Sequence, residues 1–146
     1  MRAVIITKPG GPEVLRIQDI EEPTMGPEEV LIEIKATALN RADLAQRMGR
    51  YPAPEGIRND MPGLEMAGVV LRVGDRVYDI SEGDRVFGLL NGGGYAERVV
   101  THHRMIMRIP ENLNYVEAAS IPEVYFTSYD ALFNQCSLGM GERVLI

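Results

Sequence analysis

The sequence predicts a mainly β domain with short helices that leads into a second unit. Up to residue 110, short apolar or alternating stretches are separated by clusters of Gly, Pro, Asn and Asp, which is typical of strands joined by turns. From Tyr115 the apolar residues recur with a helical period, and a fresh apolar stretch follows Gly139. Many strands, then helices, then a new strand indicate a β domain followed by another fold unit.

Composition and charge exclude several classes of protein. The 146 residues fit one domain, and 45% hydrophobic with 25% charged residues is typical of a soluble globular chain. A net charge of -6 argues against a nucleic-acid partner. No apolar run reaches the roughly 20 residues that a membrane-spanning helix needs. The single cysteine, Cys136, and the absence of a secretion signal at Met1 indicate a cytoplasmic protein.

The first third of the chain predicts three strands. Ala3–Thr7 is short and apolar, and the turn cluster Pro9-Gly10-Gly11-Pro12 separates it from its expected hairpin partner, Val14–Ile20. Glu29–Leu39 alternates between apolar and polar residues, which predicts a strand with one face buried.

A helix is expected directly after this strand, over Arg41–Arg50. Asn40 followed by Asp43 has the spacing of a helix N-cap arrangement. Asp43 and Arg47 lie one turn apart and are interpreted as a surface ion pair. The apolar side of this helix is expected to consist of Leu44, Ala45 and Met48.

The next segment combines a loop with a buried strand. Tyr51–Pro62 is rich in proline and reads as a loop, and Leu64–Val73 is the strand that follows. Gly68 interrupts this strand, so a bulge or a close backbone approach is expected there. Glu65 places a carboxylate on a buried strand, which is costly unless the carboxylate is paired. We therefore expect an internal salt bridge between Glu65 and an arginine.

The remaining strands are expected at Arg85–Leu90, Tyr95–His102 and Met105–Ile109. Two helices should follow, a short one at Tyr115–Ser120 and a longer one from Pro122 to Gln135.

The longer helix carries an apolar stripe, and a last strand is expected after it. We interpret the stripe as core packing. The strand should cover Arg143–Ile146. The stripe consists of Tyr125, Phe126, Tyr129, Leu132 and Phe133.

Several segments together resemble a known family. They are AVIITKPGGPEVL, ATALNRADLAQRMGRYP, PGLEMAGVV, GDRVFGL, GGYAE and AASIPEVYFTSYDAL. Their order and spacing are similar to those of the zinc-independent quinone oxidoreductases of the medium-chain dehydrogenase/reductase superfamily. The resemblance implies a GroES-like, partly open β-barrel over residues 1–122. Residues 123–146 would then be the junction helix and first strand of a truncated Rossmann domain, whose glycine-rich phosphate-binding turn is absent from this sequence.

The resemblance also bears on metal binding. Zinc-dependent relatives carry Cys at about the place of Asn40 and Gly-His-Glu at about the place of Gly63-Leu64-Glu65. A catalytic zinc needs about three ligands from Cys, His or carboxylate, and an amide and a leucine do not supply them. The adjacent pair His102 and His103 and the distant Cys136 offer no substitute. We predict that the protein holds no metal.

Three residues are predicted to form the site. The resemblance implies that Asn40 lines the nicotinamide and substrate pocket, a role compatible with that of a helix cap. It implies a pocket role for Tyr51, whose phenol could polarise a carbonyl oxygen or only form a wall of the site. The alternative for Tyr51 is an anchor for the proline-rich loop. Thr127 would lie near the nicotinamide, or its hydroxyl would only bond to a helix carbonyl.

The resemblance therefore implies an NADPH-dependent oxidoreductase that transfers hydride to quinones or other α,β-unsaturated carbonyls. The fragment alone would be inactive. Two alternatives stay open: an enoyl reductase of the same superfamily, and a non-enzymatic GroES-like binding module. The expected partners are a small quinone or enone, with neither nucleic acid nor membrane. Self-association stays open, because isolation would expose the junction strand and the apolar side of the last helix.

Overall fold

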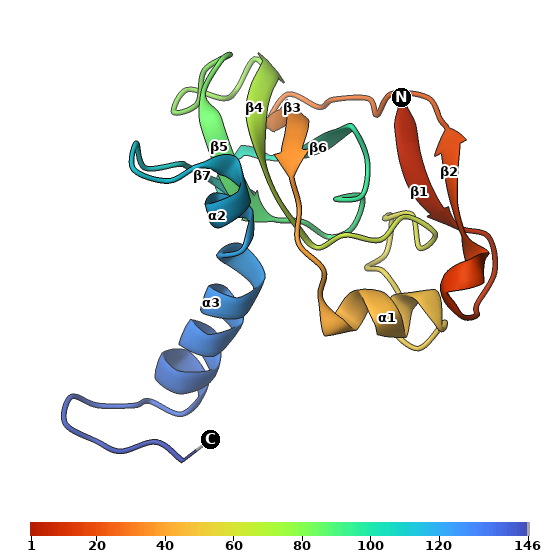
Figure 1. The fold of residues 1–146 in the computed structure, drawn as a ribbon. Coiled ribbons are helices and arrows are strands. Elements are labelled where there is room, and N and C mark those ends of the chain that lie inside the picture. Colours follow the sequence, from red (N-terminus) through yellow and green to blue (C-terminus); the bar gives the residue numbers. More distant parts are fainter. Residues whose placement is uncertain (146) are drawn as a thin grey trace.

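The protein is described by a computed structural model over residues 1–145, in which two antiparallel sheets carry the fold (Figure 1). A hairpin pairs β1 (Arg2–Ile6) with β2 (Leu15–Asp19), and a five-stranded sheet has the order β6-β3-β4-β5-β7. These sheet strands are β3 (Glu29–Ala36), β4 (Glu65–Val73), β5 (Arg85–Leu89), β6 (Arg98–His102) and β7 (Ile106–Arg108).

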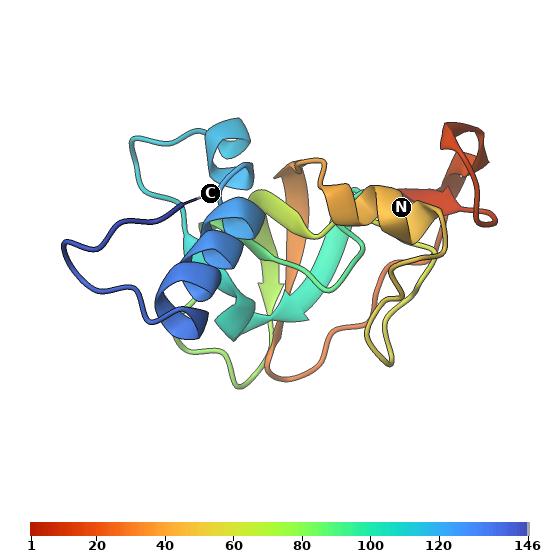
Figure 2. The same cartoon turned by 90° about the horizontal axis from the view of Figure 1, so that it is seen from below.

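Three helices complete the arrangement: α1 (Arg41–Arg47), α2 (Tyr115–Ala119) and α3 (Pro122–Tyr129), the last continued by a π-helical turn over Asp130–Gln135. In both views of the ribbon, α1 lies between the β1–β2 hairpin and α3 (Figures 1 and 2). Within residues 1–145, no helix is long and apolar enough to cross a bilayer.

The prediction of a mainly β fold with short helices is confirmed, and every strand expected before residue 110 is present. The main core lies on one face of the five-stranded sheet and includes Val30, Ile32, Met66, Val70 and Val86. Within the described chain the sheets stay open, because the ladder runs from β6 to β7 without a pairing between these two outer strands.

The close approach expected at Gly68 is confirmed. Gly68 pairs with Ile34, and the register between β3 and β4 shifts immediately after this pair. A Cβ atom on Gly68 would lie 2.2 Å from the carbonyl oxygen of Glu33 and 2.8 Å from a side-chain carbon of Ile32. Only glycine lets the two strands approach this closely.

Two expectations for the end of the chain are wrong. Arg143–Leu145 forms no strand, and Ile146 lies outside the described residues. A strand needs a neighbour for its backbone hydrogen bonds, and among residues 1–145 no strand pairs with this segment. The apolar stripe of α3 is not core either, because Tyr125, Tyr129 and Phe133 are largely exposed.

Replacing Gly68 with Ala should lower the free energy of unfolding by about 1–3 kcal/mol, the usual cost of overpacking. Urea denaturation of the chain measures this change. Gly139→Ala is the matched control, because its added Cβ would meet only the far end of the Glu142 side chain, at 3.4 Å. Equal stability of the two variants would contradict the close approach.

Candidate functional site

The site is built around the start of α1, where β3 ends and the chain turns. Asn40 is the N-cap residue, and its backbone N–H donates to the Asp43 carboxylate at 2.7 Å, as predicted for a capped helix. The Asn40 side chain reaches further, since its Nδ2 donates to Oε1 of Glu65 at 2.7 Å. Asn40 therefore caps α1 and also joins it to β4.

Asp43 is a buried acceptor, with only 5% of its surface exposed. One carboxylate oxygen accepts from the Gly63 backbone N–H at 3.2 Å, and the other accepts from the Tyr95 hydroxyl at 2.7 Å. The predicted surface pair of Asp43 with Arg47 is wrong. Arg47 turns away, and its Nε donates to the Gly10 carbonyl.

The buried face of α1 is consequently polar. Asp43 and Gln46 face the protein, whereas Leu44 and Met48, expected to pack inward, are about half exposed. Gln46 is satisfied by donating to the Asn59 carbonyl at 3.0 Å. Asp43 and Gln46 bond to groups on loops that are distant in sequence. The helix is therefore oriented with these polar residues inward and its apolar residues partly exposed.

Glu65 is the most deeply buried charged residue of the described chain, with 1% of its surface exposed. The predicted salt bridge to an arginine is wrong. The Glu65 carboxylate instead accepts from the Asn40 amide and, through Oε2, from the backbone N–H of Glu123 at 2.9 Å. Glu123 lies in the first turn of α3, where backbone N–H groups lack partners within the helix and favour an anion.

Tyr95 completes this arrangement and was not predicted as a site residue. Burial raises the pKa of its phenol far above the usual range, and the Asp43 carboxylate raises this pKa further. The hydroxyl thus stays a proton donor to Asp43. Gly63 lets the segment before β4 lie against the loop that carries Tyr95, because its φ of +106° and its contact with Gly94 leave no room for a Cβ atom.

We call Asp43 and Glu65, with their donors, the carboxylate cluster. Five neutral donors bind its four oxygens: the Asn40 backbone and amide, Gly63 N–H, the Tyr95 hydroxyl and Glu123 N–H. Within residues 1–145 no Lys, Arg or His forms an ion pair with Asp43 or Glu65. The negative charge also acts outward, because burial raises the pKa of the Glu123 side chain and the charges of Glu65 and Asp43 add to this effect.

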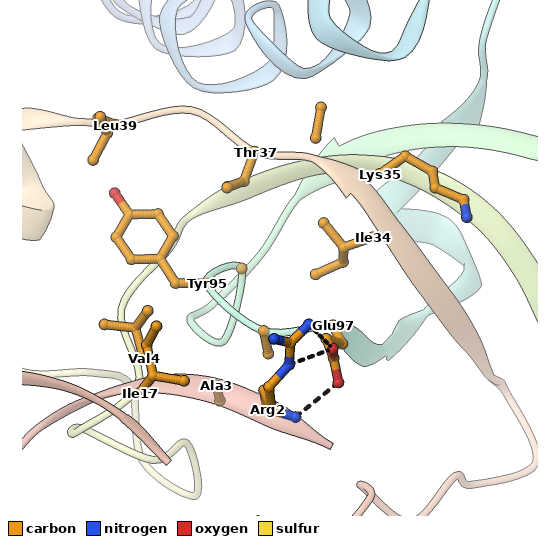
Figure 3. Close-up of a pocket in the computed structure, with 13 residues that line it drawn as sticks. Arg2, Ala3, Val4, Ile17, Ile34, Lys35, Thr37, Leu39, Tyr95 and Glu97 are labelled. Atoms are coloured by element: carbon orange, nitrogen blue, oxygen red, sulfur yellow. Dashed lines mark hydrogen bonds and ion pairs between the residues drawn. The ribbon is translucent and has the colours of Figure 1, made fainter. Parts of the chain in front are cut away.

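Two pockets flank Tyr95. A pocket of about 610 Å³ lies between the β1–β2 hairpin and the end of β3, and Figure 3 shows Tyr95 standing between Leu39 and the pair Val4 and Ile17. A second pocket of about 440 Å³ shares Tyr95 and Leu39 with the first and is also lined by Asn40.

Tyr51 lies in a third, smaller pocket of about 150 Å³. Its walls include Leu64, Leu89, Leu90 and Glu123. The phenol is 46% exposed, and its hydroxyl bonds to no other residue in the described part of the chain. Asn40 and Tyr51 thus line different pockets. Two hydrogen bonds of the Glu65 carboxylate connect Asn40 to the backbone of Glu123, a residue that lines the Tyr51 pocket.

Thr127 is exposed on α3, one helical turn after Glu123. No contact joins it to Asn40 or Tyr51 within residues 1–145. The cysteine and histidines stay apart from the site: Cys136 is exposed, and His103 pairs with Asp79 at 2.8 Å. Among the described residues, no group of three or more His, Cys, Asp or Glu side chains could hold a metal ion. The prediction of a metal-free site stays a prediction.

Comparison with known proteins assigns the family. The family described as the alcohol dehydrogenase GroES-like domain matches residues 26–111. The chain belongs to the alcohol dehydrogenase GroES-like domain family. The matched residues include the carboxylate cluster apart from Glu123.

Relatives confirm the predicted resemblance. A quinone oxidoreductase from Lama guanicoe is 36% identical over 148 residues, which cover 100% of this chain and 44% of the relative. A solved structure of the human synaptic vesicle membrane protein VAT-1 homolog-like protein has a TM-score of 0.88 and 34% identity, over 97% of this chain and 45% of that one. A mycobacterial protein solved in complex with NADPH has a TM-score of 0.85 and 31% identity, over 97% and 44%. This chain therefore spans less than half the length of these relatives.

Tyr95→Phe should lower the free energy of unfolding by about 1–3 kcal/mol, because the buried Asp43 carboxylate loses one of its hydrogen-bond donors. Chemical denaturation at pH 7 measures the change. Tyr78→Phe is the control: Tyr78 is 88% exposed, so its variant should stay within about 0.5 kcal/mol of the parent. A similar small effect at Tyr95 would show that the hydroxyl contributes nothing to the cluster.

Proposed function

We propose that this chain is the substrate-side half of an NADPH-dependent, zinc-independent oxidoreductase that transfers hydride to quinones or other α,β-unsaturated carbonyls. The observation that supports the proposal is the amide of Asn40, which the buried Glu65 carboxylate holds in one place. The phenol of Tyr51 lines a separate pocket whose walls are partly apolar, at Leu64, Leu89 and Leu90, and partly polar, at Gln46 and Asn91. The relatives that are quinone oxidoreductases support the same reaction class.

The residues present fit the nicotinamide end of the cofactor. Asn40 offers an amide, Thr127 offers an exposed hydroxyl, and the pocket beside Asn40 has two arginines, Arg41 and Arg47, on its rim. The mycobacterial relative solved with NADPH supports this choice of cofactor. In our proposal, the cofactor phosphates are bound by a domain that follows residue 146, and the boundary between the two domains lies near residues 122 and 123.

When bound, the reduced nicotinamide supplies a hydride to the acceptor. Leu64, Leu89 and Leu90 form the apolar part of the Tyr51 pocket, against which the flat ring of the acceptor would pack. The Tyr51 hydroxyl donates a hydrogen bond to the carbonyl oxygen of the acceptor, on which negative charge develops as hydride arrives. In this proposal Asn40 and Tyr51 contact the reacting molecules from the substrate side, and Thr127 contacts the nicotinamide.

The zinc-independent part of the proposal rests on the donor set. The position at which zinc-dependent relatives carry cysteine is an amide whose nitrogen faces a carboxylate, and Leu64 supplies an apolar side chain where a histidine would bind metal. Neither residue offers the thiolate or imidazole that a zinc site requires. We also propose a cytoplasmic location, consistent with the single free cysteine, Cys136.

The test uses a polypeptide in which a nicotinamide-binding domain follows residue 146. NADPH oxidation is measured with a 1,4-benzoquinone, a simple enone and an enoyl thioester. We expect turnover with the quinone or the enone, and Tyr51→Phe should lower the catalytic rate by roughly 10²-fold because the carbonyl oxygen loses its donor. Tyr78→Phe, on the exposed surface, should leave the rate unchanged.

Other outcomes would contradict the proposal in distinct ways. Turnover with the thioester alone would identify an enoyl reductase. No turnover with any acceptor, in a polypeptide that binds NADPH, would favour a binding module. A normal rate for Tyr51→Phe would reduce Tyr51 to a wall of the pocket.

A further inference from the structure

We infer that Glu65 is the positioning residue of this site: its carboxylate fixes the orientation of the Asn40 amide and, through the same group, the place of the first turn of α3. The inference rests on the role proposed for Asn40, and it adds a residue that touches neither substrate nor cofactor. Glu65 would act only through the two groups that it binds.

Both oxygens of Glu65 are used, each by a different wall of the site. Oε1 accepts from Nδ2 of Asn40 at 2.7 Å, and Oε2 accepts from the Glu123 backbone N–H at 2.9 Å. Because Glu65 is 1% exposed, water cannot take over either bond if it breaks. A single carboxylate therefore bridges Asn40 and the first turn of α3.

The carboxylate also decides which way the amide of Asn40 points. The two ends of an asparagine amide are nearly equal in size, so packing alone does not choose between them. An ionised carboxylate only accepts hydrogen bonds, which requires the nitrogen to face Glu65. The N-cap position requires the opposite end, the oxygen, to face the free N–H groups of α1. Both neighbours select the same orientation.

This orientation defines what Asn40 can offer to a ligand. One of its two N–H groups is bound to Glu65, which leaves the second N–H and a lone pair of the oxygen. A flipped amide would place the oxygen against the Glu65 carboxylate and expose both N–H groups instead. A site that binds the cofactor or substrate through hydrogen bonds to the Asn40 amide therefore depends on Glu65.

Glutamine is the sharpest substitution at position 65. It has the same shape as glutamate, but it offers one acceptor and one donor to two groups that both donate. Glu65→Gln therefore cannot keep both bonds as they are: it loses one of them, or the Asn40 amide flips so that its oxygen accepts from the new side-chain amide. Glu82→Gln is the matched control, because it removes the same charge from an exposed position outside the site.

The first experiment reads the amide itself, in the 146-residue chain and without any ligand. In the ¹⁵N-resolved NMR spectrum, the two side-chain protons of Asn40 should have widely separated shifts, because only one of them is bound to a carboxylate. Glu65→Gln should reduce this separation, whereas Glu82→Gln should leave it unchanged. An identical Asn40 signal in the parent and in Glu65→Gln would overturn the inference.

The second experiment is a double-mutant cycle in the polypeptide that carries the nicotinamide-binding domain. Asn40→Ala and Glu65→Gln should each lower kcat/KM by roughly 10- to 100-fold, the usual range for a misplaced reacting group. If Glu65 acts through Asn40, the double variant should fall no more than about 2-fold below Asn40→Ala. Losses that multiply would show that Glu65 acts independently and would overturn the inference.

A third variant tests the contact even if Glu65→Gln fails to fold. Asn40→Asp sets a second carboxylate against Glu65, and this like-charge contact raises the pKa of the folded pair. The variant should be less stable than the parent at pH 7 and should regain stability as the pH falls and the pair binds a proton. Asn112→Asp, at an exposed position, should show neither effect. Parent-like stability of Asn40→Asp at pH 7 would contradict the contact.

These experiments distinguish failure of this inference from failure of the proposed function. The NMR and stability measurements depend only on the Glu65 contacts, so they stay readable if the polypeptide has no oxidoreductase activity. If those measurements succeed and turnover is absent, the proposed function is wrong and the contact is real. If turnover is present and the Asn40 signal is the same in the parent and in Glu65→Gln, the positioning role is wrong.

Discussion

The whole arrangement depends on keeping two carboxylates, Asp43 and Glu65, inside the protein without a cation. Burying a charge is costly unless hydrogen bonds replace its water. Here the replacement comes from five neutral donors, among them a backbone N–H at the first turn of a helix, where the free N–H groups favour an anion. Each donor must be held in place, and this requirement explains the local structure around them.

The constraint draws together chain segments that are far apart in sequence. The start of α1 supplies Asn40 and Asp43, and β4 begins at Glu65. The glycine contact at Gly63 places Tyr95, and the first turn of α3 supplies Glu123. The five-stranded sheet supplies a rigid support because its core is fully apolar. The cluster therefore links the support to both walls of the proposed site. The proposed role of the Asn40 amide gains from such a link, because a group that acts on a ligand must be held at a fixed place.

Local patterns predicted the parts of this fold that local physics decides. The alternation in Glu29–Leu39, the cap at Asn40 and the close approach at Gly68 all depend on neighbours in sequence or in one ladder, and all were found. The long-range partners of Asp43 and Glu65 were not foreseen, because they lie 20 to 58 residues away. The helical pattern of α1 predicted that its apolar side faces the protein. The two hydrogen bonds that the buried Asp43 carboxylate accepts from outside the helix outweigh this preference. Tyr95 belongs to the GGYAE segment, which indicated the family but not a role for this tyrosine.

The roles of Asn40, Tyr51 and Thr127 remain predictions, since the structure gives their positions and not their chemistry.

Hydrogen exchange of two backbone N–H groups, those of Gly63 and Glu123, tests the central claim most directly. Neither group lies inside a strand ladder or the middle of a helix, so without the cluster both should exchange readily. If they donate to buried carboxylates, their exchange should require opening of the cluster, with an opening free energy that approaches that of the core strands. Exchange of both groups at the rate of an unstructured peptide, while β3 and β4 stay protected, would contradict the account.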